Sequence, residues 1–416
     1  MIKTKPFTLS KWQVSTAFER VKANAGASGV DQQSIQDFER NLQDNLYKLW
    51  NRLSSGSYYP PPVKAVAIPK KTGGERILGI PTVADRVAQM VVKLEFEPQV
   101  EPYFLEDSYG YRPNKSAIDA IGTTRQRCWR YDWVLEFDIK GMFDNIPHEL
   151  LLKVVEKHTE TRWVRLNIER WLTAPMEKSN GEVIARTKGT PQGGVISPLL
   201  ANLFMHYTFD KWLERHYPEV KWCRYADDGL VHCTSEAEAQ HMLTVLKQRF
   251  EDCGLELHPE KTKIVYCKDA NRKGVYKNTS FDFLGYTFRG RICENRKRNI
   301  LFVNFTPAVS KVSLKAMRLK IRKLRVRMKT ELNINQMAKW LNPIIRGWIG
   351  YYGRYHRSAM LSICRHINKT LIRWAKQKYK KLRRQKTRAG LFVKGIALRS
   401  PNLFAHWKSG MVSVFA

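Results

Sequence analysis

Residues 222–231 read WCRYADDGLV, and this stretch gives the strongest indication of the fold. Two short β-prone segments flank the adjacent aspartates Asp227 and Asp228, which predicts a hairpin with both acids at its tip. Neighbouring carboxylates repel each other, and Mg²⁺ suits such a place because it prefers hard oxygen ligands and retains waters and phosphates. Taken alone, the pair has a plainer explanation, since aspartates are common in turns.

A third acid extends the pattern. Asp138 ends the strand predicted over residues 133–138 (WVLEFD), about ninety residues before the hairpin. Together the three carboxylates could hold two metal ions about 3.5–4 Å apart, an arrangement that activates a hydroxyl and stabilises the leaving group in in-line phosphoryl transfer. The sequence therefore predicts a phosphoryl-transfer site assembled from distant segments.

The surrounding chain mixes predicted strands and helices with long connections between strands, which is typical of an α+β fold. Helices are predicted over residues 10–52 (two, separated by a glycine-containing loop at 26–29), 82–100, 147–158, 162–174 and 236–253. Strands are predicted over 63–68, 76–78, 133–138, 220–233, 255–265 and 281–288. Thr82 and Ser235 are expected to cap the helices that follow them.

Beyond about residue 305 the pattern changes to long basic helices. One apolar stripe at helical spacing comprises Leu314, Met317, Ile321, Leu324 and Met328. A second comprises Trp340, Ile344, Trp348, Tyr352 and Tyr355, and a third comprises Ile363, Ile367, Leu371 and Trp374. These stripes predict a helical bundle.

The formal charge of +34 is concentrated at one end of the chain. Residues 291–416 hold 31 lysines and arginines against two glutamates, a net charge of +29, whereas residues 1–290 hold 41 against 36 acids, a net charge of +5. A solvated helix usually carries both signs, so this excess predicts a surface for nucleic acid. Before any motif is considered, nonspecific RNA binding of the ribosomal type is the alternative.

The seven cysteines are scattered and none lies in a CxxC pair, so neither a structural zinc site nor a disulfide framework is predicted. That pattern suits a reducing cytosol. The N-terminus lacks an apolar signal core, and no stretch approaches the ~18 apolar residues of a membrane span. We expect a soluble cytoplasmic protein without a membrane partner.

Several motifs then point to one family. Residues 225–228 match the YADD signature of reverse transcriptases, and residues 137–144 (FDIKGMFD) match their first metal-binding motif. Other blocks follow the expected order: IPK (68–70), GGER (73–76), LGIPT (78–82), DSYGYRP (107–113), GTPQGGVISPLLAN (189–202), FLGY (283–286), IRGWIGYY (345–352) and LFAHW (403–407). Over nearly its whole length, the sequence resembles a group II intron-encoded reverse transcriptase of the maturase family.

The resemblance implies an α+β right-hand polymerase, with fingers and palm on antiparallel sheet, followed by an α-helical thumb or maturase domain. The boundaries expected are an N-terminal extension with the start of the fingers (1–62), fingers and palm (63–300), the basic thumb or maturase domain (301–385) and a C-terminal tail (386–416). Two Mg²⁺ ions, which Mn²⁺ can replace, are the expected cofactors. The partners implied are an RNA template with a DNA primer, deoxynucleoside triphosphates, the parent group II intron RNA and target DNA, in a bacterial or archaeal host.

The family's functional residues carry over to matching positions. Asp138, Asp227 and Asp228 would be the catalytic, metal-binding carboxylates, with the Ile139 carbonyl as a neutral ligand. Lys70, Arg76, Phe143 and Gln192 would bind the incoming nucleotide, Phe143 by excluding a ribose 2′-hydroxyl. Primer or template contacts are expected from Arg112, Gly193, Gly194, Tyr225, Ala226 and Lys261, and RNA contacts from Arg318, Arg322, Arg325, Arg346 and Trp348. Without the motif register, these would be explained as solvated cations, core rings or plain turns.

The expected function is dual: stabilising the parent intron RNA for splicing, and copying it into DNA by target-primed reverse transcription. The alternatives are a splicing factor that only binds RNA, a free-standing domesticated or defence-associated reverse transcriptase, and an RNA-dependent RNA polymerase. The retained acids disfavour the first, and Phe143 disfavours the last. An HNH-type DNA-cutting module is not expected, because the sequence stops at Ala416 and its cysteines are wrongly placed; primers would come from nicks or replication forks made by others.

Overall fold

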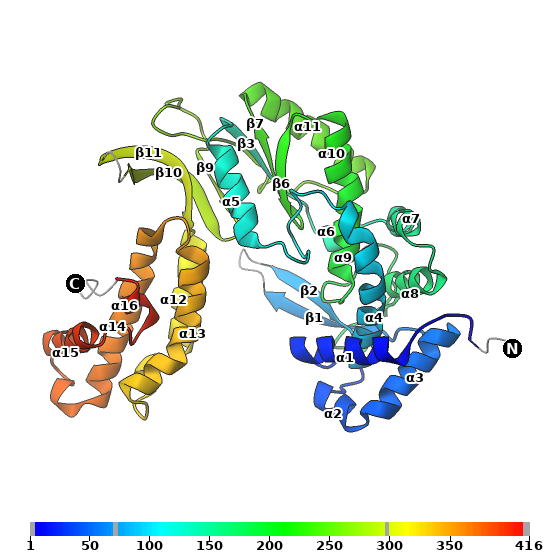
Figure 1. The fold of residues 1–416 in the computed structure, drawn as a ribbon, viewed down its shortest axis with the longest axis horizontal. Coiled ribbons are helices and arrows are strands. Elements are labelled where there is room, and N and C mark those ends of the chain that lie inside the picture. Colours follow the sequence, from blue (N-terminus) through cyan, green and yellow to red (C-terminus); the bar gives the residue numbers. More distant parts are fainter. Residues whose placement is uncertain (1–4, 70–73, 296–298, 411–416) are drawn as a thin grey trace. The chain divides into compact units, whose positions relative to one another are not determined.

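The computed structural model describes residues 5–69, 74–295 and 299–410. The chain forms two compact units: unit 1 comprises residues 1–120 and 135–264, and unit 2 comprises residues 121–134 and 265–416. Unit 1 mixes sheets and helices, whereas most of unit 2 after residue 310 is helical (Figure 1). The predicted α+β organisation is therefore confirmed.

Unit 1 begins with three helices rather than the two predicted, because the backbone of Asn41 (φ −118°, ψ 44°) interrupts the second. The elements up to the long central helix are α1 (Lys11–Asn24), α2 (Ile35–Arg40), α3 (Leu42–Ser55), β1 (Val63–Pro69), β2 (Glu75–Ile80) and α4 (Val83–Val100). Thr82 caps α4 as predicted, its hydroxyl accepting from the Asp85 amide. Helix α4 packs against α1 and α3 and forms the apolar centre of this part of the unit.

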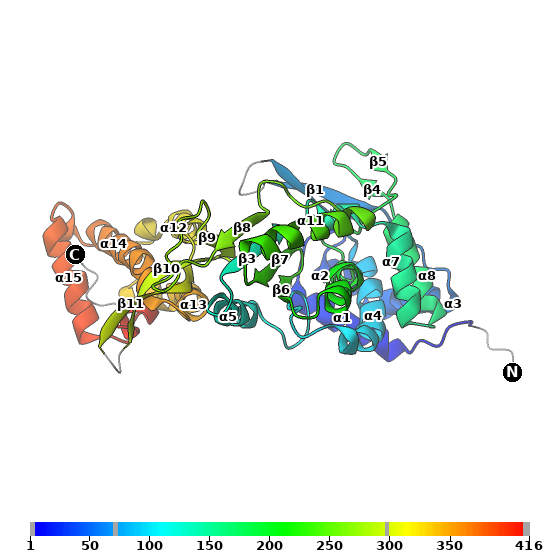
Figure 2. The same ribbon diagram turned by 90° about the horizontal axis from the view of Figure 1, so that it is seen from above.

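Two four-stranded sheets position the rest of unit 1. The first has the order β2-β1-β4-β5 and includes β4 (Met176–Glu177) and β5 (Val183–Ile184), with β4 parallel to β1. The second has the order β6-β7-β3-β8, formed by β6 (Lys221–Tyr225), β7 (Asp228–Cys233), β3 (Trp133–Asp138) and β8 (Lys263–Tyr266). Helix α11 (Glu236–Asp252), capped by Ser235 as predicted, lies beside β7 (Figure 2).

The remaining helices of unit 1 are mostly short: the 3₁₀ turn Glu101–Tyr103, α6 (Met142–Asn145), α7 (His148–His158), α8 (Arg162–Thr173), α9 (Ser197–Met205) and α10 (Lys211–His216). A π-helical turn (His206–Asp210) joins α9 to α10. Such turns are often found at functional sites. Here the turn ends at Asp210, which is fully buried.

Unit 2 contains an antiparallel sheet and a helical bundle. Its elements are α5 (Ala117–Cys128, begun in unit 1), β9 (Ser280–Phe283), β10 (Tyr286–Asn295), β11 (Ile300–Val309), α12 (Lys311–Lys323), α13 (Ile334–Tyr352), α14 (Leu361–Lys378), α15 (Lys386–Arg399) and α16 (Ala405–Lys408). The 3₁₀ turns are Val326–Met328, Arg357–Met360 and Lys380–Leu382. Sheet order is β11-β10-β9. The bundle shares one apolar core extending from α12 to α16.

Some predicted elements differ from those observed. The strand expected over 255–265 is confined to β8, and the one expected over 281–288 is split by a turn in which Leu284 and Gly285 have positive φ. The first basic helix ends at Lys323 because Arg325 adopts a left-handed conformation (φ 47°), so Met328 is exposed rather than part of the stripe. The stripe of α14, from Ile363 to Trp374, is buried as predicted.

Helix α13 buries a face adjacent to the predicted stripe. Met337, Ala338, Leu341, Asn342 and Ile345 are buried, whereas the predicted Trp340, Ile344, Trp348 and Tyr352 are only partly buried.

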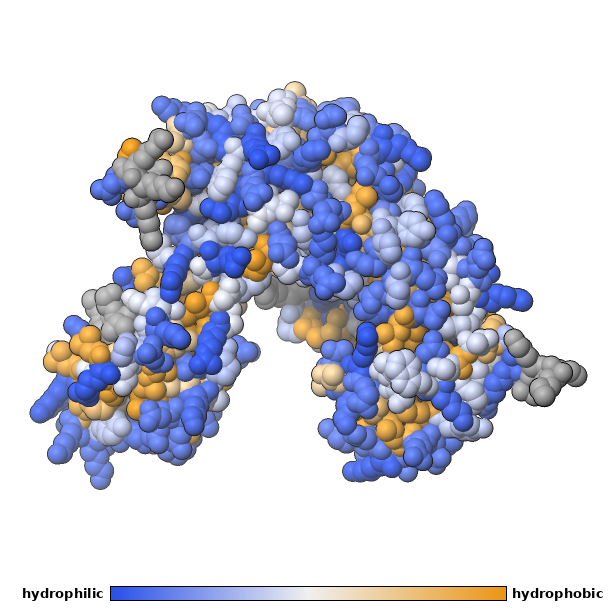
Figure 3. All heavy atoms as spheres, viewed as in Figure 1, coloured by the Kyte–Doolittle hydropathy of each residue, from blue (hydrophilic) through white to orange (hydrophobic). Residues whose placement is uncertain are grey.

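Hydrophilic residues cover most of the molecular face in Figure 3. No helix in the described ranges has both the length and the apolar composition needed to cross a membrane.

Candidate active site

The hairpin predicted from WCRYADDGLV is present in unit 1. Strands β6 and β7 pair antiparallel with Tyr225 opposite Asp228, so Ala226 and Asp227 form the turn between them. Ala226 takes the left-handed conformation that this tight connection requires (φ 58°). Asp228 is the first residue of β7, and both aspartates therefore lie at one end of the sheet, as the sequence predicts.

A glycine brings this hairpin close to the strand that carries Asp138. In the sheet β7 neighbours β3, and a Cβ atom on Gly229 would overlap the ring of Phe137. Because Gly229 follows Asp228 and Phe137 precedes Asp138, this close packing brings the two carboxyl groups together. They share a hydrogen bond. The structure thus unites the three acids that sequence reasoning selected.

The acids share a strongly negative, largely buried environment. Burial, followed by the charges of Asp227, Asp138 and Glu136, raises the pKa of Asp228 to about 8. Burial and Asp138 also raise the pKa of Asp227, against the opposing charges of Arg76 and Lys261. Carboxyl groups whose negative charge is disfavoured in this way are suited to a divalent cation, which would stabilise their ionised forms.

Two lysines form ion pairs with carboxylates of strand β3. The Lys261 ammonium is 2.9 Å from Oδ2 of Asp138, and the Lys263 ammonium is 3.1 Å from Oε2 of Glu136. Within residues 5–69, 74–295 and 299–410, no three Asp, Glu, His or Cys side chains already stand in a metal-binding arrangement. The donor set fits Mg²⁺ by its chemistry. Lys261 occupies Oδ2 of Asp138, so a metal ion held through that oxygen would have to displace the ammonium group.

The backbone beside Asp138 leaves a further oxygen donor. Ile139 faces Leu257 across an isolated antiparallel bridge, whose hydrogen bonds run from Lys140 N to Glu256 O and from His258 N to Asp138 O, at 2.8 Å each. The bridge therefore uses neither the amide nor the carbonyl of Ile139. This leaves the carbonyl available for the neutral-ligand role predicted for it.

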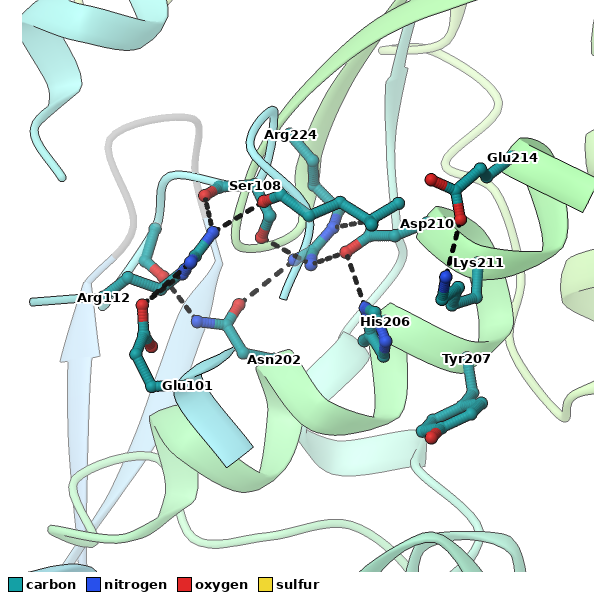
Figure 4. A network of polar contacts seen from close by, with 12 residues as sticks. Glu101, Ser108, Arg112, Asn202, His206, Tyr207, Asp210, Lys211, Glu214 and Arg224 are labelled. Carbon is teal, nitrogen blue, oxygen red and sulfur yellow. Dashed lines mark hydrogen bonds and ion pairs between the residues drawn. The ribbon is translucent and has the colours of Figure 1, made fainter. Parts of the chain in front are cut away.

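A buried arginine holds the hairpin through a network of hydrogen bonds (Figure 4). Arg224, in β6, donates to both carboxylate oxygens of Asp210 at 2.6 and 2.7 Å. It also donates to Oδ1 of Asn202 and to the Ala226 carbonyl at 3.1 Å, and to the Ser108 hydroxyl at 2.8 Å. Through the Ala226 carbonyl, this guanidinium fixes the turn that carries Asp227.

Asp210 is ionised despite its burial. Burial opposes its charge, but the charge and hydrogen bonds of Arg224 outweigh that effect and hold the pKa of Asp210 below its ordinary value. The carboxylate comes from the π-helical turn after α9, and it therefore couples that helix to the hairpin. Sequence reasoning missed this pair; an arginine before Tyr-Ala-Asp-Asp, in a strand expected to be buried, was the signal that could have found it.

On another side of the site, Arg76, Gln192 and Asp144 form a chain of hydrogen bonds. Arg76 Nε donates to Oε1 of Gln192, and Gln192 Nε2 donates to Oδ2 of Asp144 at 2.8 Å. A carboxylate only accepts hydrogen bonds, so Asp144 fixes which way the Gln192 amide points. Asp144 was not among the predicted site residues. Arg186, another charged neighbour of Asp144, was also missed.

The loop around Gln192 is held at its backbone. The Gly79 amide donates to the Gln192 carbonyl at 2.8 Å, and Gly193 (φ 123°) approaches the Gly79 carbonyl too closely for a side chain. Beyond it, the Val195 amide donates to Oε1 of Gln89 at 2.7 Å. Of the two glycines predicted to allow close backbone approach, Gly193 lies against strand β2 and Gly194 lies against Ser197 and Gln89.

Phe143 is buried at the start of the short helix α6, and its ring meets the ring of Tyr111 edge-on at 6.5 Å. Tyr111 has a positive φ of 58° and an exposed side chain. Burial and the nearby Asp227 carboxylate raise the pKa of Tyr111. The tyrosine thus connects Phe143 with the acid cluster, a role that the sequence motifs did not reveal.

Not every predicted contact lies in the described site. Lys70 lies outside the described residues. Arg112 is almost fully buried: it pairs with Glu101 at 2.8 Å and donates to the carbonyls of Leu105 and Ser108. We therefore assign Arg112 a structural role and do not propose it as a template contact.

The predicted RNA-binding residues all belong to unit 2. Arg318 donates to the Ser362 hydroxyl at 3.3 Å, whereas Arg322 and Arg325 line a cavity. Arg346 is exposed on α13, and Trp348 is half-buried against the helical core. Their contact with RNA stays a prediction.

Comparison with known proteins agrees with this geometry. A model of reverse transcriptase (RNA-dependent DNA polymerase) matches residues 68–288, and a model of the group II intron maturase-specific domain matches residues 314–390. The chain belongs to the group II intron reverse transcriptase and maturase family. The predicted reverse-transcriptase fold followed by a helical maturase region is thereby confirmed.

Relatives within the family include Protein YkfC of Escherichia coli, 30% identical over 338 residues, which are 71% of this chain and 82% of that protein. The group II intron-encoded protein LtrA of Lactococcus lactis is 35% identical over 193 residues, 46% of this chain and 32% of LtrA. Among solved structures, Candida albicans telomerase aligns over 92% of this chain and 69% of its own, with 12% identity and a TM-score of 0.46. This reverse transcriptase and maturase homologue thus spans about a third of LtrA and most of YkfC.

Proposed function

We propose that this chain copies RNA into DNA at the cluster of Asp138, Asp227 and Asp228, and that it binds its parent group II intron RNA, assists its splicing and reverse transcribes it from a primer at the DNA target. The observation that carries the catalytic half is the packing of Gly229 on Phe137, which unites carboxylates from two strands. The maturase-specific match and the basic C-terminal region support the intron half.

Two Mg²⁺ ions, for which Mn²⁺ can substitute, would be held by Asp138, Asp227, Asp228 and the Ile139 carbonyl. When bound, the ions lower the pKa of the primer 3′-hydroxyl and stabilise charge on the attacking and leaving oxygens. Lys261 leaves Asp138 and becomes free to contact the primer or template. Arg224 keeps the turn of Tyr225, Ala226 and Asp227 rigid throughout.

The nucleotide would enter beside the chain of Arg76, Gln192 and Asp144. Arg76 is exposed and hydrogen-bonded only through Nε to Gln192 among the described residues, which leaves its terminal nitrogens for the triphosphate. Phe143 would lie under the sugar and exclude a 2′-hydroxyl. The backbone at Gly193 and Gly194 would approach the primer terminus and the templating base.

The basic helices of unit 2 would bind the template–product duplex and the intron RNA by phosphate contact and shape, as proteins commonly bind A-form helices. Arg318, Arg322, Arg325, Arg346 and Trp348 are the contacts proposed. The bacterial origin of YkfC and LtrA supports a cytoplasmic location in a bacterial or archaeal host.

Two assays on the purified chain test the two halves. The first measures extension of a DNA primer on an RNA template with the four deoxynucleoside triphosphates and Mg²⁺; we expect synthesis by the wild-type chain and none by Asp138→Asn. The second measures splicing of the intron RNA encoded around the reading frame, at Mg²⁺ concentrations too low for unaided splicing. Extension without any stimulation of splicing would contradict the maturase half and leave a free-standing reverse transcriptase.

A further inference from the structure

A cationic cavity of about 540 Å³ lies in unit 2, between the end of α12, the 3₁₀ turn after it, and α14. Its polar lining comes from Arg322, Arg325, Arg327, Arg373 and His366, with Thr370 beside them. Its volume falls within the range of about 300–1,000 Å³ that is usual for pockets holding small molecules. The feature is therefore large enough for a nucleotide-sized ligand.

The fold builds this cavity from fixed parts. Helix α12 ends at Lys323, and the left-handed backbone of Arg325 (φ 47°) sends the chain into the turn Val326–Met328. Helix α14 holds the chain just after that turn: Trp374 Nε1 donates to the Lys329 carbonyl at 2.9 Å, and Lys378 Nζ donates to the Thr330 carbonyl at 2.6 Å. A left-handed arginine is uncommon, and such residues often occur at ligand sites.

The cavity carries positive charge without a carboxylate to balance it. No Asp or Glu lines it, and within residues 5–69, 74–295 and 299–410 none of its four arginines has an ion-pair partner. The positive charge also acts on His366, whose pKa is lowered by burial and then by Arg318, Arg373 and Arg322. Four unpaired guanidinium groups around one hollow favour an anionic ligand, and phosphate accepts their paired N–H donors well.

The three remaining lining residues of the cavity are apolar. Ile321 and Val326 are each only 2% exposed, so Met328, which is 55% exposed, offers most of the accessible apolar surface. All four lining arginines are exposed, so their donors are accessible to the phosphates of a polyanion. No Phe, Tyr or Trp is among the lining residues, so a base inside would contact aliphatic side chains rather than stack on a ring.

We propose that this cavity accepts one unstacked nucleotide of a bound RNA, with its flanking phosphates on the arginines and its base against Met328. The proposal rests on the RNA-binding function proposed above and adds a preference for RNA that contains an unpaired nucleotide. Bulges and loops supply such nucleotides, because their bases can be turned out of the helix. A fully paired duplex cannot do so without breaking a base pair.

The test compares two RNA hairpins of the same stem sequence, one with a single 2-aminopurine bulge and one with 2-aminopurine paired to uracil. We expect the full chain to bind the bulged hairpin about tenfold more tightly, equivalent to roughly 1.4 kcal/mol. The 2-aminopurine fluorescence of the bulged hairpin should rise on binding, because the base leaves the stack and meets no aromatic ring. Binding of the paired hairpin should leave the fluorescence nearly unchanged.

Two variants examine the two parts of the cavity. Thr370→Trp fills the hollow but keeps all four arginines, so it should abolish the preference for the bulge while the affinity for the paired hairpin stays the same. Arg325→Gln combined with Arg373→Gln keeps the hollow and should weaken the bulged hairpin more than the paired one. Arg388→Gln, at an exposed arginine on α15 outside the cavity, is the matched control and should preserve the preference.

Equal binding of both hairpins by the wild-type chain would overturn the nucleotide pocket and leave the proposed RNA binding intact. Binding of neither hairpin would overturn both. A bulge preference that survives in Thr370→Trp, with folding confirmed by thermal unfolding, would also overturn the pocket, as would an equal loss in Arg388→Gln.

Discussion

Two arginines of unit 1 differ in their partners from two arginines of unit 2. In unit 1, Arg224 is fully buried against Asp210, and Arg112 is almost fully buried against Glu101. In unit 2, Arg322 and Arg373 line a cavity that contains no carboxylate. A paired, buried guanidinium stabilises the fold that holds a site, whereas an unpaired one on a cavity is available to a polyanion. Substitution of Arg224 or Arg112 should therefore cost stability, whereas substitution of Arg322 or Arg373 should cost nucleic-acid binding.

The largest effect is expected when the buried ion pair of Arg224 and Asp210 is removed. Arg224→Met leaves Asp210 buried without its cation, and removing one partner of a buried ion pair typically costs about 3–5 kcal/mol. Urea unfolding measures this loss. Adding Asp210→Leu removes the stranded charge and should recover part of it. A loss below about 1 kcal/mol in Arg224→Met would mean that the pair is not what holds the hairpin.

The next effect concerns substrate choice in unit 1. Phe143→Ala should reduce discrimination between deoxyribonucleotides and ribonucleotides by about 10–200-fold, since a steric difference in a pocket is worth roughly 1–3 kcal/mol. Single-nucleotide extension with dCTP and CTP gives the ratio of kcat/KM. Phe143→Tyr keeps the bulk and should keep the discrimination. Unchanged sugar selection in Phe143→Ala would refute the steric role.

A smaller effect is expected at Asp144, which fixes the amide of Gln192. An asparagine at 144 can donate or accept, so it no longer dictates which end of the amide faces Arg76. We expect kcat/KM for the incoming deoxynucleotide to fall about tenfold, or roughly 1.4 kcal/mol. In a Gln192→Ala background, the same substitution should have almost no further effect. Additive losses would show that Asp144 acts independently of Gln192.

The smallest effect is expected at a buried histidine of unit 2, which among the described residues has no charged partner to compare with that of Arg224. Unit 2 buries His406, whose pKa is lowered to about 3 by burial, beside Asn368 at 2.7 Å. The pKa of His406 in the folded protein lies below the ordinary value of 6.5. The neutral ring therefore contributes stability that is fully present above pH 6.5 and is lost as the pH falls toward 3. Between pH 7.5 and 5.5, wild type should lose about 1 kcal/mol more unfolding free energy than His406→Phe. Equal losses would show that His406 does not titrate on unfolding.

Local pattern was enough to predict much of the fold. The hairpin at Tyr225–Asp228, the caps at Thr82 and Ser235, and the buried stripe of α14 depend on neighbours in sequence, and the structure confirms each. The apolar stripe of α12 was overextended, because periodicity does not reveal that Arg325 turns left-handed and ends the helix.

Long-range partners were less accessible. Asp138 was joined to the hairpin acids by its place at the end of a predicted strand and by the motif order. The pairing of Arg224 with Asp210 and of Gln192 with Asp144 depends on tertiary contacts across 14 and 48 residues. Arg112 was predicted from a motif to contact the template, but its side chain is buried against Glu101, a contact that the motif does not reveal. Charge density predicted a nucleic-acid surface in the C-terminal region, but only the fold revealed a cavity there.

The most direct test of the division between the units is Asp227→Ala, measured for two activities on one preparation. Primer extension on an RNA template with Mg²⁺ should fall by about 10³-fold or more, the consequence of losing several kcal/mol of metal-assisted stabilisation. The dissociation constant for the intron RNA, measured at fixed salt, should stay within about twofold. Equal loss of extension and binding, or extension that persists, would contradict the assignment of chemistry to unit 1 and RNA binding to unit 2.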